Sequence, residues 1–151
     1  MIKLSTKGRY GTRLMLNLAR HYKNGNEATI LKNVSEEEGI SIRYLEQIII
    51  PLKINRLVKS IRGAGGGYIL ARNPGEIHLC DILHALEGSC SLVECIEDET
   101  YCEKIKTCGT HEIWKGATEL LRNYFENISL QNGLEICEKK AASAKKKIKV
   151  K

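Results

Sequence analysis

Residues 39–51 of the chain read GISIRYLEQIIIP, and they decide what the surrounding segments form. The preceding residues, 29–38, have the apolar spacing of a short helix. Gly39 can end that helix cheaply because glycine adopts the left-handed conformation, and Ser41 can cap a second helix. A helix, a glycine turn, one apolar residue and another helix together predict a helix-turn-helix motif.

The second helix of this motif divides into an apolar face and a polar face. Its apolar spacing predicts that Leu45, Ile48 and Ile49 turn to the core, and Pro51 predicts a kink or an end nearby. Arginine and glutamine are types that read base edges with two hydrogen bonds, so the polar face is a candidate DNA-reading surface. An ordinary helical hairpin with polar residues in water would show the same spacing. The candidate DNA-reading residues on this helix are Ser41, Arg43, Tyr44, Glu46 and Gln47.

A β-hairpin is predicted directly after the motif. Residues 57–62 (LVKSIR) and 68–72 (YILAR) have the composition of two strands, separated by the glycine-rich tip GAGGG. A nucleotide-binding loop would need a helix after its glycines, whereas a strand follows here. The bare tip beside Arg62, containing Gly65 and Gly66, suits a wing whose backbone approaches DNA closely. A flexible turn without a ligand is the simpler alternative.

Charge changes sign along the 151 residues. Residues 1–72 carry 13 Lys and Arg against 5 Asp and Glu, whereas residues 73–138 carry 4 against 13. Residues 139–151 add 7 Lys and no acid. A basic first part joined to an acidic second part predicts a module that binds a polyanion and a separate control module.

Composition also bears on where the chain works. No apolar run approaches the roughly 20 residues that a membrane span needs, and the opening MIKLSTKGRY lacks the apolar core of a secretory signal. We therefore expect a cytoplasmic protein without a membrane partner. Thiols stay reduced there, so clustered cysteines indicate metal or redox chemistry more than disulfides.

The segment 90–114 holds four of the six cysteines. Within it, Cys95, Cys102 and Cys108 are followed by His111, with gaps of six, five and two residues. Apolar residues are sparse, so the segment cannot order itself by burial alone. A metal held by thiolates would supply the missing folding energy.

Three thiolates and one imidazole suit more than one centre. Structural zinc takes such a set, but its ligands usually come in knuckles two to four residues apart. Only the gap between Cys108 and His111 has that length, and a two-iron, two-sulfur (2Fe-2S) cluster accepts a longer loop. Free thiols or a redox disulfide form a third interpretation.

The remaining segments complete the predicted architecture. Residues 111–128 predict a helix of roughly 27 Å with a wide apolar stripe. One small winged domain cannot cover such a helix, so we expect a homodimer. The predicted fold is mainly α with a small β wing, a winged helix-turn-helix plus a long dimerisation helix. Its predicted parts are a DNA-binding domain (1–75), a cluster-binding loop with the dimerisation helix (76–134), and a basic, disordered tail (135–151).

Five quoted stretches give the chain a specific resemblance. The opening LSTKGRYGTRLML, the segment GISIRYLEQI, the wing SIRGAGGGY, the three cysteines ending in C-x-x-H, and WKGATELLRNYFENISLQNGL occur in this order over residues 1–134. Together they resemble the IscR-type iron–sulfur regulators, which are winged-helix bacterial transcription factors.

The resemblance implies a homodimer that binds operator DNA and represses cluster-assembly genes. It also implies a 2Fe-2S cluster on Cys95, Cys102, Cys108 and His111. The first cysteine gap is one residue longer than in better-known members, so Cys90 is a possible substitute ligand.

Other classes fit the sequence less well. Nitric-oxide sensors of the same fold use a carboxylate from the first helix, and no acid precedes Glu27 here. The cysteine-metabolism repressors of this fold carry no cluster and lack this cysteine set. An electron carrier or assembly scaffold would not need the helix-turn-helix and wing, and no nucleophile–base pair indicates an enzyme. A zinc- or thiol-based regulator of the same fold stays open.

Overall fold

The computed structural model describes the backbone of residues 3–148 and the side chains of residues 3–144. This part of the chain is mainly helical with one two-stranded sheet, which confirms the predicted fold class. Its main elements are α1 (Thr6–Lys23), α2 (Leu31–Glu38), α3 (Ile42–Ile54), β1 (Val58–Ile61), β2 (Gly67–Leu70), α4 (Leu79–Glu87), α5 (Gly109–Glu126) and α6 (Leu130–Ile148).

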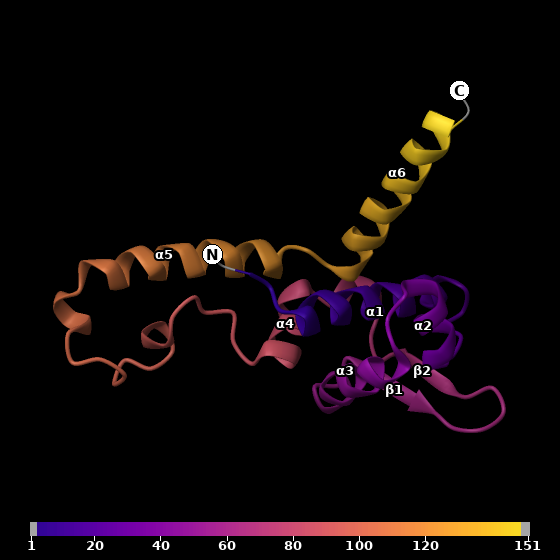
Figure 1. The fold of residues 1–151 in the computed structure, drawn as a ribbon, viewed down its shortest axis with the longest axis horizontal. Coiled ribbons are helices and arrows are strands. Elements are labelled where there is room, and N and C mark those ends of the chain that lie inside the picture. Colours follow the sequence, from indigo (N-terminus) through magenta and orange to yellow (C-terminus); the bar gives the residue numbers. More distant parts are fainter. Residues whose placement is uncertain (1–2, 149–151) are drawn as a thin grey trace.

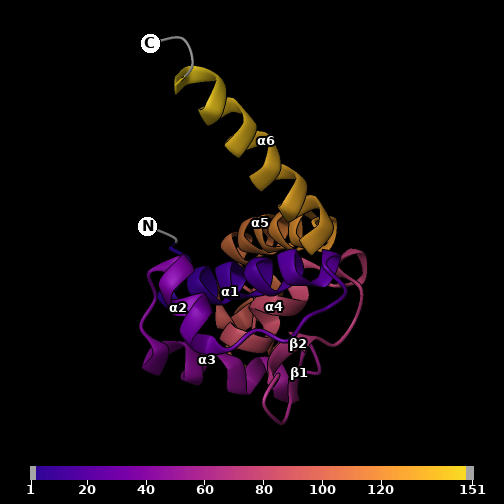
Figure 2. The same ribbon diagram turned by 90° about the vertical axis from the view of Figure 1, so that its right-hand side faces the viewer.

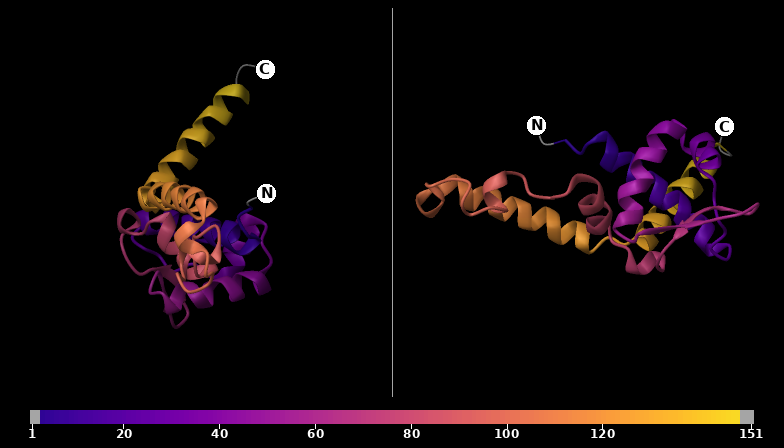
Figure 3. Two further views of the ribbon diagram at one scale, coloured as in Figure 1. Left: turned by 90° about the vertical axis from the view of Figure 1, so that its left-hand side faces the viewer. Right: turned by 90° about the horizontal axis from the view of Figure 1, so that it is seen from below.

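The elements form a compact body with two projecting arms. Helices α1 to α4 and the β-hairpin gather into the body, while α5 runs outward with the cysteine-bearing segment beneath it (Figure 1). Helix α6 leaves the body in another direction, as the view turned by 90° shows (Figure 2). The view from below separates α5 from the hairpin, at opposite ends of the molecule (Figure 3).

Helix α1 is the central element of the body. Ser5 caps it by accepting a hydrogen bond from the backbone N–H of Gly8 at 3.0 Å. Its apolar face is fully buried against the other elements of the body, because Leu14, Met15 and Leu18 are at most 1% exposed. These three side chains share one core with residues of α3, α4 and the hairpin.

The helix-turn-helix forms as predicted, with one difference. Gly39 adopts the left-handed conformation (φ 63°) after α2, and Ser41 caps α3 through the backbone N–H of Tyr44. Helix α2 begins at Leu31, because Thr29 pairs in a β-bridge with Tyr68 instead of starting the helix.

Helix α3 ends three residues after Pro51, at Ile54, which is the nearby end that Pro51 predicted. The helix extends past the proline because a proline so near the end removes only one helical hydrogen bond. Leu45, Ile48 and Ile49 face the core, as the apolar spacing predicted.

The wing is an antiparallel hairpin with the register Val58↔Leu70 to Ile61↔Gly67. Its tip closes through a hydrogen bond from the N–H of Gly66 to the carbonyl of Gly63 at 2.9 Å. A Cβ at position 66 would lie 2.6 Å from the carbonyl oxygen of Ile61, so the turn requires glycine there.

The C-terminal segment differs from its prediction. Residues 135–151 were predicted to be disordered, but α6 continues to Ile148, and residues 149–151 lie outside the described part. This segment contains Ala141, Ala142 and Ala144 among lysines, and both residue types favour helix strongly. Its composition excludes a buried core but still permits an exposed helix. Within residues 3–148, no helix is long and apolar enough to span a membrane.

Candidate functional site

The polar face of α3 is presented to solvent on the outside of the body. Arg43, Glu46 and Gln47 are exposed, and Ser41 at the cap is exposed beside them. Tyr44 differs from these because it is half-buried, with its ring edge-on to Tyr10 at 5.7 Å between centroids. Three side chains of α3 are therefore free to contact a ligand, while Tyr44 also anchors the helix to α1.

The wing lies on the same side of the body as α3 (Figures 1 and 2). Arg62 and Gly65 are exposed at its tip, and Gly66 is half-buried by the close approach of the hairpin backbone. The structure thus brings the predicted recognition helix and wing to one surface, which is the arrangement that contacts a groove and its flanking backbone.

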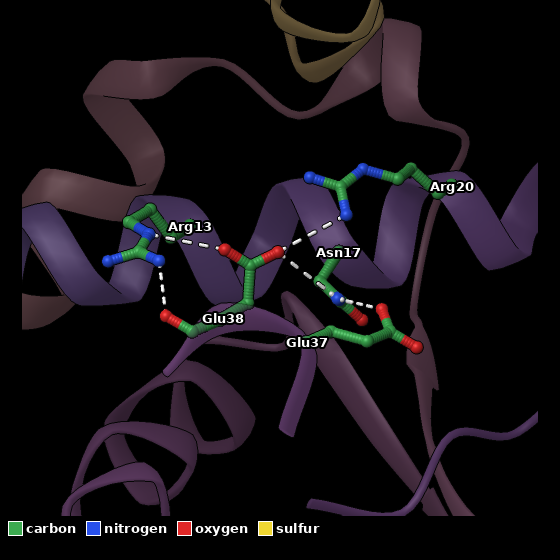
Figure 4. Close-up of polar contacts among 5 residues, drawn as sticks. All are labelled: Arg13, Asn17, Arg20, Glu37 and Glu38. Atoms are coloured by element: carbon green, nitrogen blue, oxygen red, sulfur yellow. Dashed lines mark hydrogen bonds and ion pairs between the residues drawn. The ribbon is translucent and has the colours of Figure 1, made fainter. Parts of the chain in front are cut away.

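A polar network ties α2 to α1 behind this surface (Figure 4). The carboxylate of Glu38 accepts from Arg13 Nε and from Arg20 at 3.2 Å each, and Arg13 also donates to the backbone carbonyl of Glu38. Asn17 is fully buried and its Nδ2 donates to Glu37 at 2.7 Å and to Glu38 at 3.2 Å.

Arg13 of α1 thus forms an ion pair with Glu38 of α2. The sequence analysis missed the network. Its signal was the acidic run before Gly39 facing Arg13, Asn17 and Arg20, which share one face of α1.

The candidate metal ligands lie around the first turn of α5. Cys108 is the N-cap of α5 and His111 lies in its first turn, so the short gap of the motif places both at one helix end. Cys95 lies in the short 3-10 turn Glu94–Ile96, where its carbonyl oxygen is 3.2 Å from Nε2 of His111. Cys102 is exposed and lines a hollow of about 470 Å³ together with His111.

These donors are neighbours without forming a closed ligand set. Within the described residues, no three His, Cys, Asp or Glu side chains are grouped closely enough to hold a metal ion. Thiols and imidazole are nevertheless the donor types that iron–sulfur clusters and zinc take. The residues present therefore fit such a group by the chemistry of their donor atoms, and two of them, Cys108 and His111, lie together at the start of α5.

The environment of Cys108 favours a thiolate. Its pKa is lowered from the ordinary value of 9.0, first by the hydroxyl of Thr110, 3.1 Å from Sγ, and next by a backbone N–H bond at His111. The thiolate is the form that binds metals, so the environment of Cys108 favours ligation.

Cys90 does not join this group. It lines a second hollow together with Cys80, Arg122 and Glu126. The structure therefore gives no support to Cys90 as a substitute ligand for the cluster-binding segment.

A helix-turn-helix with a glycine-tipped wing and a polar exposed helix face defines the chain as a winged-helix DNA-binding protein of the transcription-regulator class. The chain belongs to the Rrf2 family of iron-dependent transcriptional regulators, whose family model matches residues 4–135.

The relatives include both IscR and CymR regulators. The regulator IscR of Xenorhabdus nematophila is 36% identical over 130 residues, which cover 86% of this chain and 77% of the relative. The regulator CymR of Bacillus subtilis is 39% identical over 131 residues, which cover 87% of this chain and 88% of the relative.

Solved structures of an IscR and of a CymR also match the chain. The structure of T. potens IscR matches with a TM-score of 0.75 and 38% identity, covering 91% of this chain and 90% of that one. The structure of CymR of B. subtilis, described as the global cysteine regulator, matches with a TM-score of 0.74 and 39% identity, covering 90% and 98%.

Proposed function

We propose that this chain is a cytoplasmic, homodimeric repressor that senses iron–sulfur cluster status through a bound 2Fe-2S cluster. The observation that carries the proposal is the donor set Cys95, Cys102, Cys108 and His111, in which Cys108 and His111 lie at the start of α5 and the carbonyl of Cys95 contacts His111. Relatives of this family regulate transcription, so the response of the sensor is a change in DNA binding. The regulated genes are those of cluster assembly or sulfur metabolism.

Each ligand residue has a defined task in this proposal. Cys95, Cys102 and Cys108 supply thiolates, and Cys108 is already favoured as the anion. His111 supplies a neutral nitrogen once one ring nitrogen leaves its present partner, the carbonyl of Cys95 or the carboxylate of Glu112. When bound, the cluster supplies a redox-active centre whose potential a nitrogen ligand raises.

The DNA side of the proposal rests on the surface formed by α3 and the wing. Arg43 and Gln47 read base edges, while Arg62 with the backbone at Gly65 and Gly66 contacts the DNA at the wing. Ser41 and Tyr44 hold α3 in place by capping and by packing on Tyr10.

Glu46, on the same exposed face of α3, discriminates between DNA sites. A carboxylate repels phosphates and acceptor-rich guanine edges but accepts from a cytosine amino group. We expect it to reject some sites in cluster-free protein, so that cluster-free Glu46→Ala protein gains binding to a cluster-dependent operator. Equal binding by cluster-free wild type and Glu46→Ala would remove Glu46 from this role.

The homodimer follows from the uncovered face of α5. Ile113 is 63% exposed, Leu120 73% and Tyr124 62%, although these apolar residues repeat along one helix. A row of large apolar side chains in water is unfavourable, and a second copy supplies an equivalent row to cover it.

The test is purification without oxygen, followed by absorption spectroscopy and analysis of iron, sulfide and zinc. Coloured protein with about two iron and two sulfide per chain supports the proposal. Serine at Cys95, Cys102 or Cys108 should remove the colour, whereas Cys90→Ser and Cys137→Ser serve as matched controls that keep it. Zinc without sulfide would overturn the cluster and leave a zinc-based regulator.

A second candidate is a cluster-free regulator of cysteine metabolism. It is favoured by the 39% identity to CymR and by the candidate ligands not closing into a set. In that case a variant with serine at Cys95, Cys102 and Cys108 would bind operator DNA as tightly as wild type. A gel-shift titration of both proteins on the chain's own promoter region separates the two candidates.

A further inference from the structure

Two cysteines outside the candidate ligand set meet beside α4. Cys80 lies in the first turn of this helix, and Cys90 follows the helix end. Both thiols line one hollow of about 460 Å³ together with His84 of α4 and with Arg122 and Glu126 of α5. Both cysteines are partly exposed to solvent, and each thiol influences the pKa of the other.

The local backbone explains why residues ten positions apart meet. Gly88 ends α4 with φ 87°, a conformation that favours glycine, and its N–H bonds to the carbonyl of His84 at 3.0 Å. The chain then turns back, and the N–H of Ser91 bonds to the hydroxyl of Ser89 at 2.9 Å. Cys90 lies inside this reversal, where it returns toward the face of α4 that carries Cys80.

The segment is also fixed to α5. The N–H of Leu92 donates to the hydroxyl of Thr118 at 3.3 Å, and Thr118 is 1% exposed. The position of Cys90 is therefore held from both sides, by α4 and by α5. Two thiols that line one hollow on ordered backbone are placed to approach each other, as a disulfide requires.

We propose that Cys80 and Cys90 form a second thiol site, a dithiol that exchanges with low-molecular-weight disulfides and closes into an intramolecular disulfide. One thiol loses its proton and attacks a sulfur of the small disulfide, which releases one small thiol and leaves a mixed disulfide. The other cysteine then attacks the protein sulfur of the mixed disulfide and releases the second small thiol. The protein pair is oxidised by two electrons, and the small disulfide is reduced to two thiols.

The site is slow at neutral pH and distinct from the ligand cysteines. Burial is the first cause that raises the pKa of each thiol, and the carboxylate of Glu126 adds to it for Cys80. Less thiolate is therefore present at pH 7 than in an ordinary cysteine, so the rate of closure rises as the solution becomes more alkaline.

Closure joins two elements that serve different parts of the molecule. Helix α4 packs on α1 and α3 in the body, and Cys90 starts the segment that leads to Cys95 five residues later. The disulfide links the body covalently to the beginning of the candidate sensor segment. The site does not depend on a bound cluster, so its failure and the failure of the cluster proposal are distinguishable.

Cleavage after glutamate places every cysteine in its own peptide, so the state of each thiol can be measured separately. These peptides are 77–87 for Cys80, 88–94 for Cys90, 95–97 for Cys95, 100–103 for Cys102, 104–112 for Cys108 and 136–138 for Cys137. Full-length protein is incubated with oxidised glutathione at pH 7 and pH 9, alkylated, denatured, digested and analysed by mass spectrometry.

The expected product is peptide 77–87 linked to 88–94, formed faster at pH 9 than at pH 7. Cys80→Ser and Cys90→Ser should each abolish it with an unchanged circular dichroism spectrum, whereas Cys137→Ser should leave it intact. Alkylated or only glutathionylated Cys80 and Cys90 in wild-type protein would overturn the proposal. A link from Cys90 to Cys95 would also overturn it.

Discussion

Nε2 of His111 lies 3.2 Å from the backbone carbonyl oxygen of Cys95, sixteen residues earlier in the chain. This contact brings the 3-10 turn that carries Cys95 to the first turn of α5, which carries His111. A sparse, acidic segment is thereby folded back on the helix that follows it. The same contact occupies Nε2 of His111, so ligation of a metal through that nitrogen requires a local rearrangement of the Cys95 turn.

The reactivity of Cys108 should depend on Thr110. Thr110→Ala removes the hydrogen bond that contributes most to lowering the pKa of Cys108. In cluster-free wild type, the rate of alkylation should rise with pH to a half-point below the ordinary thiol value of 9.0, and the variant's half-point should be higher. The measurement is the pH dependence of iodoacetamide labelling of peptide 104–112.

Thr107→Ala is the matched control, because the Thr107 hydroxyl donates to the carbonyl of Lys104 and not to the thiol. Identical labelling profiles for Thr110→Ala and wild type would show that the hydroxyl does not stabilise the Cys108 thiolate.

Glu38 should stabilise the body more than its acidic neighbours do. Its side chain is 9% exposed and accepts from two arginines that are 45% and 48% exposed. Glu38→Gln weakens both charge-assisted hydrogen bonds, and we expect a loss of about 1–3 kcal/mol in the free energy of unfolding. Urea unfolding measures it, with exposed Glu36→Gln as the control; equal midpoints for the two variants would contradict the role of Glu38.

Arg43 and Arg13 should affect DNA binding in different ways. Arg43→Ala should cost about 1–3 kcal/mol of binding free energy at the operator and little on unrelated DNA, because it removes a base contact. Arg13→Ala should leave the slope of log affinity against log salt unchanged, since Arg13 is paired with Glu38 rather than with phosphate. Salt titrations by fluorescence anisotropy measure both; a uniform loss on all DNA would make Arg43 a phosphate contact.

The apolar face of α5 should determine the oligomeric state. Leu120→Glu places a charge in the middle of the proposed contact between copies, where burial without a partner is costly. We expect the variant to sediment as a monomer at micromolar concentrations where wild type is a dimer. Exposed Glu119→Gln, on the adjacent position, is the control, and a variant that remains dimeric would place the interface elsewhere.

The sequence alone determined the elements of the DNA-binding body. Capping and turn residues such as Ser5, Gly39 and Ser41 act within a few positions of their own backbone, so their effects can be read without knowing what packs around them. The apolar period that buries Leu45, Ile48 and Ile49 is local in the same sense. The four candidate ligands were also found from spacing and donor type, before any geometry was available.

The tertiary structure decided which distant side chains meet. Glu38 pairs with Arg13 and Arg20, and Tyr44 packs on Tyr10. Cys80 and Cys90 line one hollow. In each case the approach of the two segments depends on the whole fold. Helix α6 shows the converse case. Composition excludes a core for its C-terminal half, but local helix propensity does not require one, so the helix extends into solvent.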